Sequence, residues 1–409
     1  MAKKNKLKNN TSSNTLQPTR NIVPKALART KSDVLTWKNA LAMALNPDNP
    51  KTFPYYNLVA DMMLDAHTTS QILNRKLKTI SANFVIKNQN GEENNELTEA
   101  LQKSNWFNTI IGHILDTEFF GYTLIELNRN EAQGITDNKS SFLPSVEVSL
   151  VPRQNVIPQK GVILKDYTDD KGIDYVNTSE YGTWLLDFGE KGDLGLINKA
   201  VPHILFSRFA QSCWSELCEI YGIPPRVMKT NTRDMAALRR AEKMMTDMGA
   251  AAWFIIDESE KFEWATTGIP ATGEVYNGLI NLCRDNISLL FSGAVIGQDT
   301  KFGSKGKELS SQEMLQSLVD ADQTKVELYI NEKVLPALYK IGVIPEQGLL
   351  FKYDQVEDLG ELWQRTIDLM PYKNIPDEWI EDKFGVKVAG DRAGYSLQLS
   401  SDIAEHFFG

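Results

Sequence analysis

A glycine- and lysine-rich stretch is the first segment whose residue types could do chemistry. Residues 297–309 read Gly-Gln-Asp-Thr-Lys-Phe-Gly-Ser-Lys-Gly-Lys-Glu-Leu, and backbone amides in such a loop could cradle a phosphate. A P-loop requires Gly, four residues and then Gly-Lys-Ser/Thr. Here Gly306-Lys307 is followed by Glu308, and Lys301 stands where the first glycine would be. The spacing therefore argues against nucleotide binding and favours a flexible connector whose lysines can contact an acidic group.

The side chains that usually carry catalysis or bind metals form no recognisable constellation. The four histidines contain no His-Glu-x-x-His pair and the three cysteines no Cys-x-x-Cys spacing, so a metal site has no support. Ser292 has Leu290 and Ala294 where a nucleophile elbow needs glycines. Cys213 and Cys218 fall on one expected helix and are typical of small core residues. We therefore predict no enzyme activity, no metal and no cofactor.

The composition is that of an ordinary globular protein. The chain has 409 residues, 42% of them apolar and 24% charged, which excludes collagen-like, low-complexity and wholly disordered classes and leaves room for two or three domains. Three cysteines are too few for a disulfide scaffold and fit a reducing compartment. The longest apolar stretches, 250–256 and 287–297, fall short of the roughly 18–20 residues that cross a bilayer. We expect a soluble intracellular protein that does not use a membrane.

The net charge of -9 hides an asymmetry. Nine of the 44 basic residues and one of the 53 acidic residues lie in residues 1–38, so this segment carries +8 and the remainder -17. A basic segment rich in Asn, Ser and Thr cannot bury enough apolar surface to offset its ordering entropy. We predict a flexible N-terminal arm over residues 1–50, which either docks on an acidic partner or nucleic acid or is a solvated tail. The acidic body argues against a sequence-reading DNA-binding protein.

The first half of the chain mixes helix and strand patterns. Apolar residues recur at helical spacing over 53–80 and again over 96–118. Shorter runs predict strands, with turn signals between the later ones that favour an antiparallel meander. These strands are expected at 81–88, 122–128, 146–151, 156–157, 162–164 and 184–188. We therefore predict an α+β domain over residues 51–202.

The second half predicts a small insert between two helices. One helix is expected to start at a Ser207 cap and to end at Tyr221-Gly222-Ile223-Pro224-Pro225, and another is expected over 274–295. The insert between them reads as a compact α/β module with a helix capped by Thr232. Its strands are expected at 227–229, 250–256 and 261–265. Such helices can lie antiparallel and project the insert away from the main body.

A very long helix is expected after the glycine- and lysine-rich loop. Ser310 or Ser311 can cap it, and its apolar stripe extends to Ile341. About 30 helical residues would span about 45 Å. Pro336 is expected to kink the helix near its end. Beyond it, two shorter helices are expected over 354–369 and 376–384.

Several stretches of this sequence resemble the Mu-type branch of tailed-phage portal proteins. The resemblance is most specific over about residues 200–345, looser over 55–200, and includes no catalytic motif. The stretches that carry it are Phe206–Lys229, which contains Tyr-Gly-Ile-Pro-Pro-Arg-Val-Met-Lys; the loop Gly297–Gly306; Asp320-Ala-Asp-Gln323 with Asn331-Glu-Lys-Val-Leu-Pro-Ala-Leu338; and Ile375-Pro-Asp-Glu-Trp-Ile-Glu-Asp-Lys-Phe-Gly385.

The resemblance implies a portal fold and a ring of subunits, usually twelve, at a unique capsid vertex. The ring would serve as the conduit for DNA packaging and ejection in the virion, after assembly in the host cytoplasm. The implied divisions are the wing (51–202), a stem helix (203–221), the clip (222–268), a second stem helix (269–296), the tunnel loop (297–309), a long spine helix (310–345) and a C-terminal wing with a short crown (346–409).

The resemblance also implies partners and the surfaces that meet them. The partners would be other copies of the chain, the terminase large subunit, the major capsid protein, a head-completion or adaptor protein, and double-stranded DNA bound without sequence preference. The expected DNA-facing residues of the tunnel loop are Gln298, Lys301, Lys305 and Lys307. The expected clip surface for terminase or adaptor comprises Arg226, Lys229, Arg233, Arg239, Glu258 and Glu260.

Two other functions remain as alternatives at this point. One is another ring component of the phage neck, such as a head-to-tail adaptor, although adaptors are usually shorter and lack the order of helix, insert and helix. The other is a soluble enzyme with an unrecognised site, which the failed motif searches disfavour.

Overall fold

The computed structural model describes nine stretches of the chain and divides it into two compact units. The described residues are 25–129, 143–169, 171–222, 226–247, 253–260, 273–295, 305–354, 359–373 and 375–386. One unit comprises residues 1–353 and the other residues 354–409. The second unit contains α11 (Leu359–Leu369) and α12 (Asp377–Phe384), and the rings of Trp363 and Phe384 lie 4.9 Å apart.

Three helices open the first unit, and the first of them corrects a prediction. They are α1 (Lys25–Ala44), α2 (Phe53–Met62) and α3 (Ala66–Ile80). Ala40 and Ala44 of α1 are buried, and Trp37 Nε1 donates to Asn198 Oδ1 at 3.0 Å. The flexible arm predicted over 1–50 is therefore wrong from Lys25 onward, because α1 has an apolar face that packs. Residues 1–24 lie outside the described residues.

The long helix predicted over 96–118 is two helices. They are α4 (Asn95–Gln102) and α5 (Asn105–Phe120), separated where Ser104 takes an extended conformation with ψ 112°. The Asn94 side chain caps α4 by accepting from the Leu97 amide at 3.1 Å. Gly121 ends α5 with φ 86°, and a Cβ there would meet the Asp193 carbonyl oxygen, so this close turn requires glycine.

The strands of the α+β body form small antiparallel sheets, but not one meander. One three-stranded sheet has the order β3 (Val146–Leu150), β2 (Thr123–Arg129), β7 (Leu185–Phe188). Another has the order β4, β5, β6, and β1 pairs with β10. Because β3 and β7 both pair with β2 rather than with β4 and β5, only the β4-β5 pairing of the predicted meander is correct, and the strand β6 was not predicted. The bounds of the remaining strands are β1 Phe84–Lys87, β4 Val156–Ile157, β5 Val162–Ile163, β6 Ile173–Asp174 and β10 Leu350–Tyr353.

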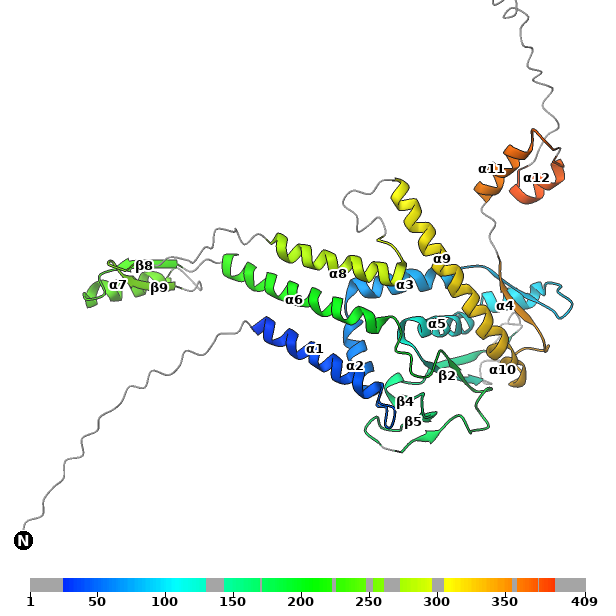
Figure 1. Cartoon of the computed structure of the whole chain (residues 1–409), viewed down its shortest axis with the longest axis horizontal. Helices are drawn as coiled ribbons and strands as arrows, with labels where there is room; N and C mark the ends of the chain where they lie inside the picture. The colour runs from blue at the N-terminus through cyan, green and yellow to red at the C-terminus, as the bar shows by residue number, and fades with distance from the viewer. Residues whose placement is uncertain are drawn as a thin grey trace, which may run out of the picture. The chain divides into compact units, whose positions relative to one another are not determined.

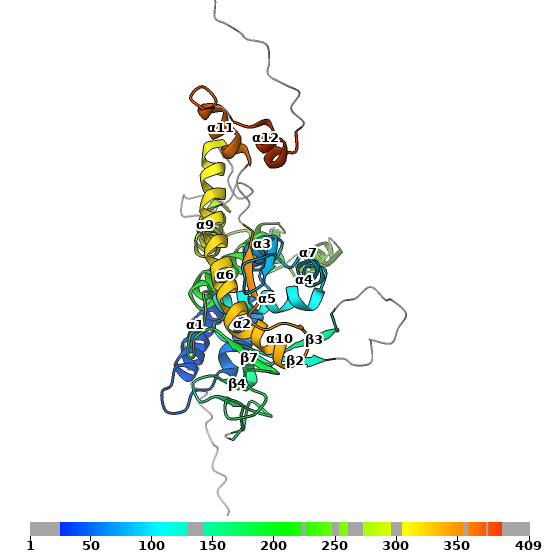
Figure 2. The same cartoon turned by 90° about the vertical axis from the view of Figure 1, so that its right-hand side faces the viewer.

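The long helix begins earlier than predicted and changes its hydrogen bonding near its end. It consists of α9 (Lys305–Tyr329), a π-helical turn (Ile330–Val334) and α10 (Leu335–Lys340). The Leu335 amide donates to Ile330, five residues back, and Pro336, which has no amide hydrogen, follows directly. In both views α10 lies beside β2 (Figures 1 and 2), and Lys333 Nζ reaches Asp187 Oδ1 on β7 at 2.7 Å.

Two helices lie side by side next to this body. They are α6 (Ile197–Gly222) and α8 (Glu274–Ser292), and α6 lies between α1 and α8 (Figure 1). The predicted start of α6 at residue 203 and its cap at Ser207 are wrong. The helix runs through Pro202, and Ser207 is a buried residue within it. Ala200, Val201, Ile204 and Leu205 are buried against α1 and α2, and this packing outweighs the single hydrogen bond that proline removes.

A buried ion pair joins three helices of the first unit. Arg75 of α3 donates from Nε and Nη2 to the two carboxylate oxygens of Asp322 on α9, at 2.7 and 2.8 Å. Its Nη1 donates to the carbonyl oxygen of Phe291 on α8 at 3.1 Å. Burial raises the pKa of the Asp322 carboxyl group, and the bonds from Arg75 oppose that effect. Both side chains are almost fully buried, so each depends on the other for its hydrogen bonds.

We expect Asp322→Asn to lower the free energy of unfolding by about 3–5 kcal/mol, because it leaves the Arg75 charge buried without a counter-charge. The double variant Arg75→Met, Asp322→Leu should recover much of that loss, because it removes both charges together. Urea unfolding followed by tryptophan fluorescence measures both. Lys103→Met is the control, because it breaks an exposed pair with Glu99 and should lower the free energy of unfolding far less than Asp322→Asn. Equal losses in the Asp322 and Lys103 variants would contradict the prediction.

Candidate functional site

A small βαβ module stands between α6 and α8 in the chain. It consists of β8 (Arg226–Thr230), α7 (Met235–Asp247) and β9 (Trp253–Asp257). The two strands pair in parallel, with Arg226 opposite Trp253 and Thr230 opposite Asp257. Ala241 and Met245 of α7 are buried, which is the helix face expected to cover the strand pair. The predicted strand and helix of this insert are therefore confirmed, and the strand predicted at 261–265 lies outside the described residues.

Asp257, at the end of β9, organises the turn structure of this module. Its Oδ2 accepts from the amide and the hydroxyl group of Thr232, at 3.1 and 2.7 Å. Its Oδ1 accepts from the amide and the hydroxyl group of Ser259, at 3.1 and 2.7 Å. The hydrogen bonds from Ser259 and Thr232 hold the pKa of Asp257 well below its usual range. One carboxylate thereby holds the segment before α7 against the turn that follows β9.

The residue that caps α7 lies two positions after the predicted cap. Asp234 Oδ1 accepts from the Ala236 and Ala237 amides at 2.9 and 3.3 Å, so Asp234 caps α7. Thr232, the predicted cap, is instead committed to Asp257. Both residue types are good caps, and only the position of β9 decides between them.

Four of the charged residues predicted for the clip surface, Lys229, Arg233, Glu258 and Glu260, lie near the end of the module where β8 and β9 finish, whereas Arg226 begins β8 and Arg239 lies within α7. The Thr232 hydroxyl group donates to Asp257, and in the sequence Arg233 follows Thr232 and Glu258 follows Asp257. Lys229 is opposite Ile256 in the strand pair. The side chains of the predicted set that the structure describes are all exposed. These are Lys229, Arg233, Arg239, Glu258 and Glu260. Arg226 is placed in β8 by its backbone, and its side chain lies outside the described part.

The predicted tunnel loop is shorter than residues 297–309. α8 ends at Ser292 with Gly293 in the left-handed region, φ 71°, where a Cβ would lie 2.9 Å from Met314 Cγ. α9 already begins at Lys305, so Lys305 and Lys307 belong to its first turn. Lysine is a good helix former. The glycines of this segment led us to predict a loop where the first turn of α9 lies. Gln298 and Lys301 lie outside the described residues.

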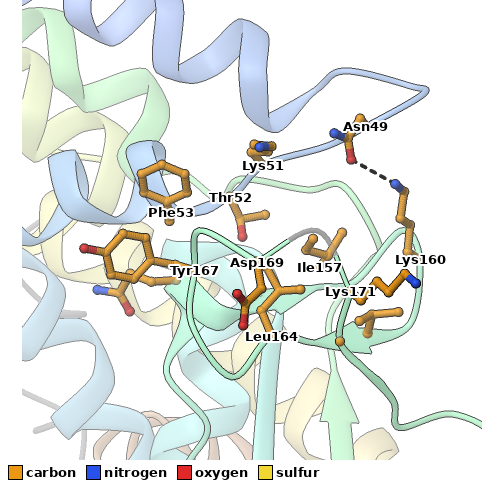
Figure 3. A pocket seen from close by; sticks show the side chains of 13 residues that line it. Asn49, Lys51, Thr52, Phe53, Ile157, Lys160, Leu164, Tyr167, Asp169 and Lys171 are labelled. Atoms are coloured by element: carbon orange, nitrogen blue, oxygen red, sulfur yellow. Dashed lines mark hydrogen bonds between the residues drawn. The ribbon is translucent and has the colours of Figure 1, made fainter.

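A pocket of about 310 Å³ lies between the segment after α1 and the β4-β5 hairpin (Figure 3). The rings of Phe53 and Tyr167 lie 4.9 Å apart at one side, and Lys160 Nζ donates to Asn49 Oδ1 at 3.0 Å at the other. The lining carries more lysine than carboxylate, so it suits a small anionic group. Sequence reasoning missed this pocket, because its residues come from segments more than 100 positions apart.

Neither a metal site nor a membrane segment is found in the described stretches. Within them, no group of three or more His, Cys, Asp and Glu side chains could hold a metal ion. Among the helices of the same stretches, none is long and apolar enough to cross a bilayer.

The described elements form an α+β body, a helix pair that flanks a small module in the chain, and a long helix after α8. The sequence matches the family model described as "Portal protein of Mu bacteriophage" over residues 56–386, which is most of the chain. The chain therefore belongs to the family of Mu-type bacteriophage portal proteins. This confirms the resemblance and the α+β portal fold class expected from the sequence.

Individual relatives are more distant. The portal protein of Escherichia phage Mu is 24% identical over 224 residues, which are 51% of this chain and 43% of that protein. A chain from the neck of an empty GTA particle is 14% identical with a TM-score of 0.46, covering 79% of this chain and 92% of that chain. An HK97-family portal protein from Corynebacterium diphtheriae is 9% identical with a TM-score of 0.36, covering 78% and 98%. The match to the Mu protein spans less than half of that relative's length.

We expect Asp257→Ala to loosen the module locally without unfolding the rest of the chain, because the four hydrogen bonds that Asp257 accepts stay within the module. Hydrogen exchange read by mass spectrometry should show several-fold faster exchange of the Thr232 and Ser259 amides. Glu258→Ala, in which an adjacent exposed carboxylate is removed, serves as the matched control. Unchanged protection of both amides in Asp257→Ala would contradict the prediction.

Proposed function

We propose that this chain forms a ring at one capsid vertex and serves there as the conduit for DNA packaging and ejection. In that role it would also be the docking platform for the terminase large subunit, the major capsid protein and a head-completion or adaptor protein. The observation that carries the proposal is membership of the Mu-type portal family over residues 56–386. The order of α6, the βαβ module and α8 agrees with it.

The proposed division of labour follows the elements. The body from α2 to β7, with the long helix and β10, would be the wing; α6 and α8 would be the stem. The β8-α7-β9 module would be the clip, with Lys229, Arg233, Arg239, Glu258 and Glu260 available to partner proteins and Arg226 at the start of β8. An isolated module of this size gains buried surface most readily by packing against neighbours, and a ring provides neighbours.

The segment between α8 and α9 is proposed to face DNA. Lysine side chains bind phosphates without reading bases, and contacts independent of sequence are what a conduit needs. We assign this role to Gln298, Lys301, Lys305 and Lys307. Residues 39–409 together carry a net charge of -17, which would limit adhesion of DNA to the ring away from these lysines.

A head-to-tail adaptor ring is the second candidate, and an enzyme is the third. The adaptor reading loses support from the family match, which is to portal proteins. For the enzyme reading we expect no ATP hydrolysis by the purified chain, since the residues around Gly306-Lys307 lack P-loop spacing. The chain is proposed to reside in the virion, after assembly in the host cytoplasm.

Electron microscopy of the purified protein tests the proposed assembly. Negatively stained particles should be rings with a central hole, and class averages should have one rotational symmetry, with twelve subunits expected. Mass photometry of the same sample should give a mass near twelve copies of the 46.1 kDa chain. Monomers or dimers at every concentration, including in the presence of capsid protein, would contradict it.

The DNA-facing role has its own test. The triple variant Lys301→Ala, Lys305→Ala, Lys307→Ala should still form rings but should lower the amount of DNA packaged or retained per particle, because three phosphate contacts per subunit are lost. DNA content of purified particles is the measurement. A control variant removes three lysines elsewhere, Lys38, Lys78 and Lys340, with the same change in charge. Equal DNA content in both variants would overturn the assignment.

A further inference from the structure

The outward face of α8 carries an apolar stripe that nothing in the described unit covers. Val275, Leu282 and Leu289 are 73%, 57% and 50% exposed. They recur every seven residues, which places them on one line along a helix. The buried face of α8, which includes Ile280 and Ile287, lies on the opposite side. A helix with apolar residues on both faces is expected to be covered on both, so we call these three residues the α8 stripe and ask what covers it.

A groove of about 580 Å³ lies on the other side of the helix pair, between α1, α2 and α6. We call it the α6 groove. The apolar part of its lining comes from Leu58, Met62, Leu64, Leu205 and Phe209. Its charged residues include Asp61 and Arg208, which pair at 2.6 Å. Leu64 is 78% exposed, so the groove presents apolar surface to solvent, as the α8 stripe does.

The α8 stripe and the α6 groove face away from each other. The side of α6 that meets α8 includes Trp214. Its ring packs against Gly273 at the start of α8, where an added Cβ atom would lie 2.9 Å from Trp214 Nε1. At 100° per residue, Leu205 and Ser212 lie roughly 160–180° around α6 from Trp214. Figure 1 shows the corresponding order of helices, with α6 between α1 and α8. One chain therefore cannot place its own stripe in its own groove.

The two surfaces also lie at the same level along the helix pair. α6 and α8 run in opposite directions (Figure 1), and Gly273 is level with Trp214. Because both helices rise about 1.5 Å per residue, Val275 is level with Ser212 and Leu282 is level with Leu205. Rotation about an axis along the helix pair preserves level. Two complementary surfaces on opposite sides and at one level are what a head-to-tail ring requires.

We propose that the α8 stripe of one copy packs into the α6 groove of the next copy, and that this contact closes the ring. The inference rests on the proposed ring and adds the pair of surfaces that builds it. It gives α1 a role, since α1 forms one wall of the groove and contributes Asp33 to its lining. The contact is heterologous, because stripe and groove are different surfaces, so each copy uses one of each.

Disulfide trapping tests the pairing and its register. The background variant Cys213→Ser, Cys218→Ser removes the more accessible native thiols, and Val275→Cys with Ser212→Cys is added to it. Mild oxidation should give a ladder of covalent multimers on a non-reducing gel, and a mixture of the two single-cysteine proteins should give dimers. The control pair Leu289→Cys with Ser212→Cys lies about 21 Å out of level and should give monomer.

Each other outcome of the trapping experiment has a definite meaning. Dimers from Val275→Cys alone would show a two-fold contact of the stripe with itself and would overturn the proposal. Rings by electron microscopy without a ladder from the level-matched pair would overturn the proposal and leave the portal function intact. Absence of rings from the unsubstituted protein under every assembly condition would count against the portal function itself.

A second variant tests the energetic role of the stripe. Leu282→Asp, Leu289→Asp should abolish rings, because two carboxylates per contact would lose solvent against the apolar side chains of a groove that already holds Asp33 and Asp61. Both positions are exposed in the single chain, so circular dichroism and thermal unfolding of the monomer should stay unchanged. Ile173→Asp, at an exposed position of 56% on β6, is the matched control and should leave rings intact. Rings formed by the double variant at the level of the control would overturn the proposal.

Discussion

The buried Arg75–Asp322 pair is the interaction on which the arrangement of the principal helices depends. A guanidinium group has donors in a fixed fork, and here they engage the Asp322 carboxylate on α9 and the Phe291 carbonyl oxygen near the end of α8. The segment that joins α8 to α9 thus starts and ends on helices that one side chain of α3 holds together. Gln71 extends the same contact, since its Oε1 accepts from the Ser292 hydroxyl group at 2.6 Å. Because Asp322 lies 17 residues beyond the start of α9, this contact fixes the middle of α9, and not its first turn, against the end of α8.

Further charged contacts extend this rigidity into the body. Burial alone would raise the pKa of Asp116, but the hydrogen bond from His113 and the charges of Lys76 and Arg153 lower it to about 2. Asp116 thereby ties α3 to α5 and to the 3₁₀ turn Arg153–Asn155. Lys333 does the same for the π-helical turn, through Asp187 on β7. The long helix is therefore fastened to the body at Asp322, near its middle, and at Lys333 in the π-helical turn.

Sequence patterns predicted the elements well where one face alone is buried, and poorly where long-range packing decides. α2, α3, β1, β2 and α8 follow from periodicity. The helix α1 was hidden by its basic composition, because its few apolar residues gain stability only against α2 and α6. β10 escaped detection because its partner, β1, is more than 260 residues away. The candidate site divides likewise: spacing located the insert, whereas the Asp257 turn depends on a contact between residues 25 positions apart.

The sequence contains no recognised catalytic motif, and α8 has apolar residues on both its buried and its exposed face. A chain whose chemistry resided in a pocket would concentrate buried polar groups there, yet the buried charges described above join one helix or strand to another. What the helix pair leaves exposed is apolar surface at a spacing of seven residues, and such surface is stabilised only when a second helix face covers it.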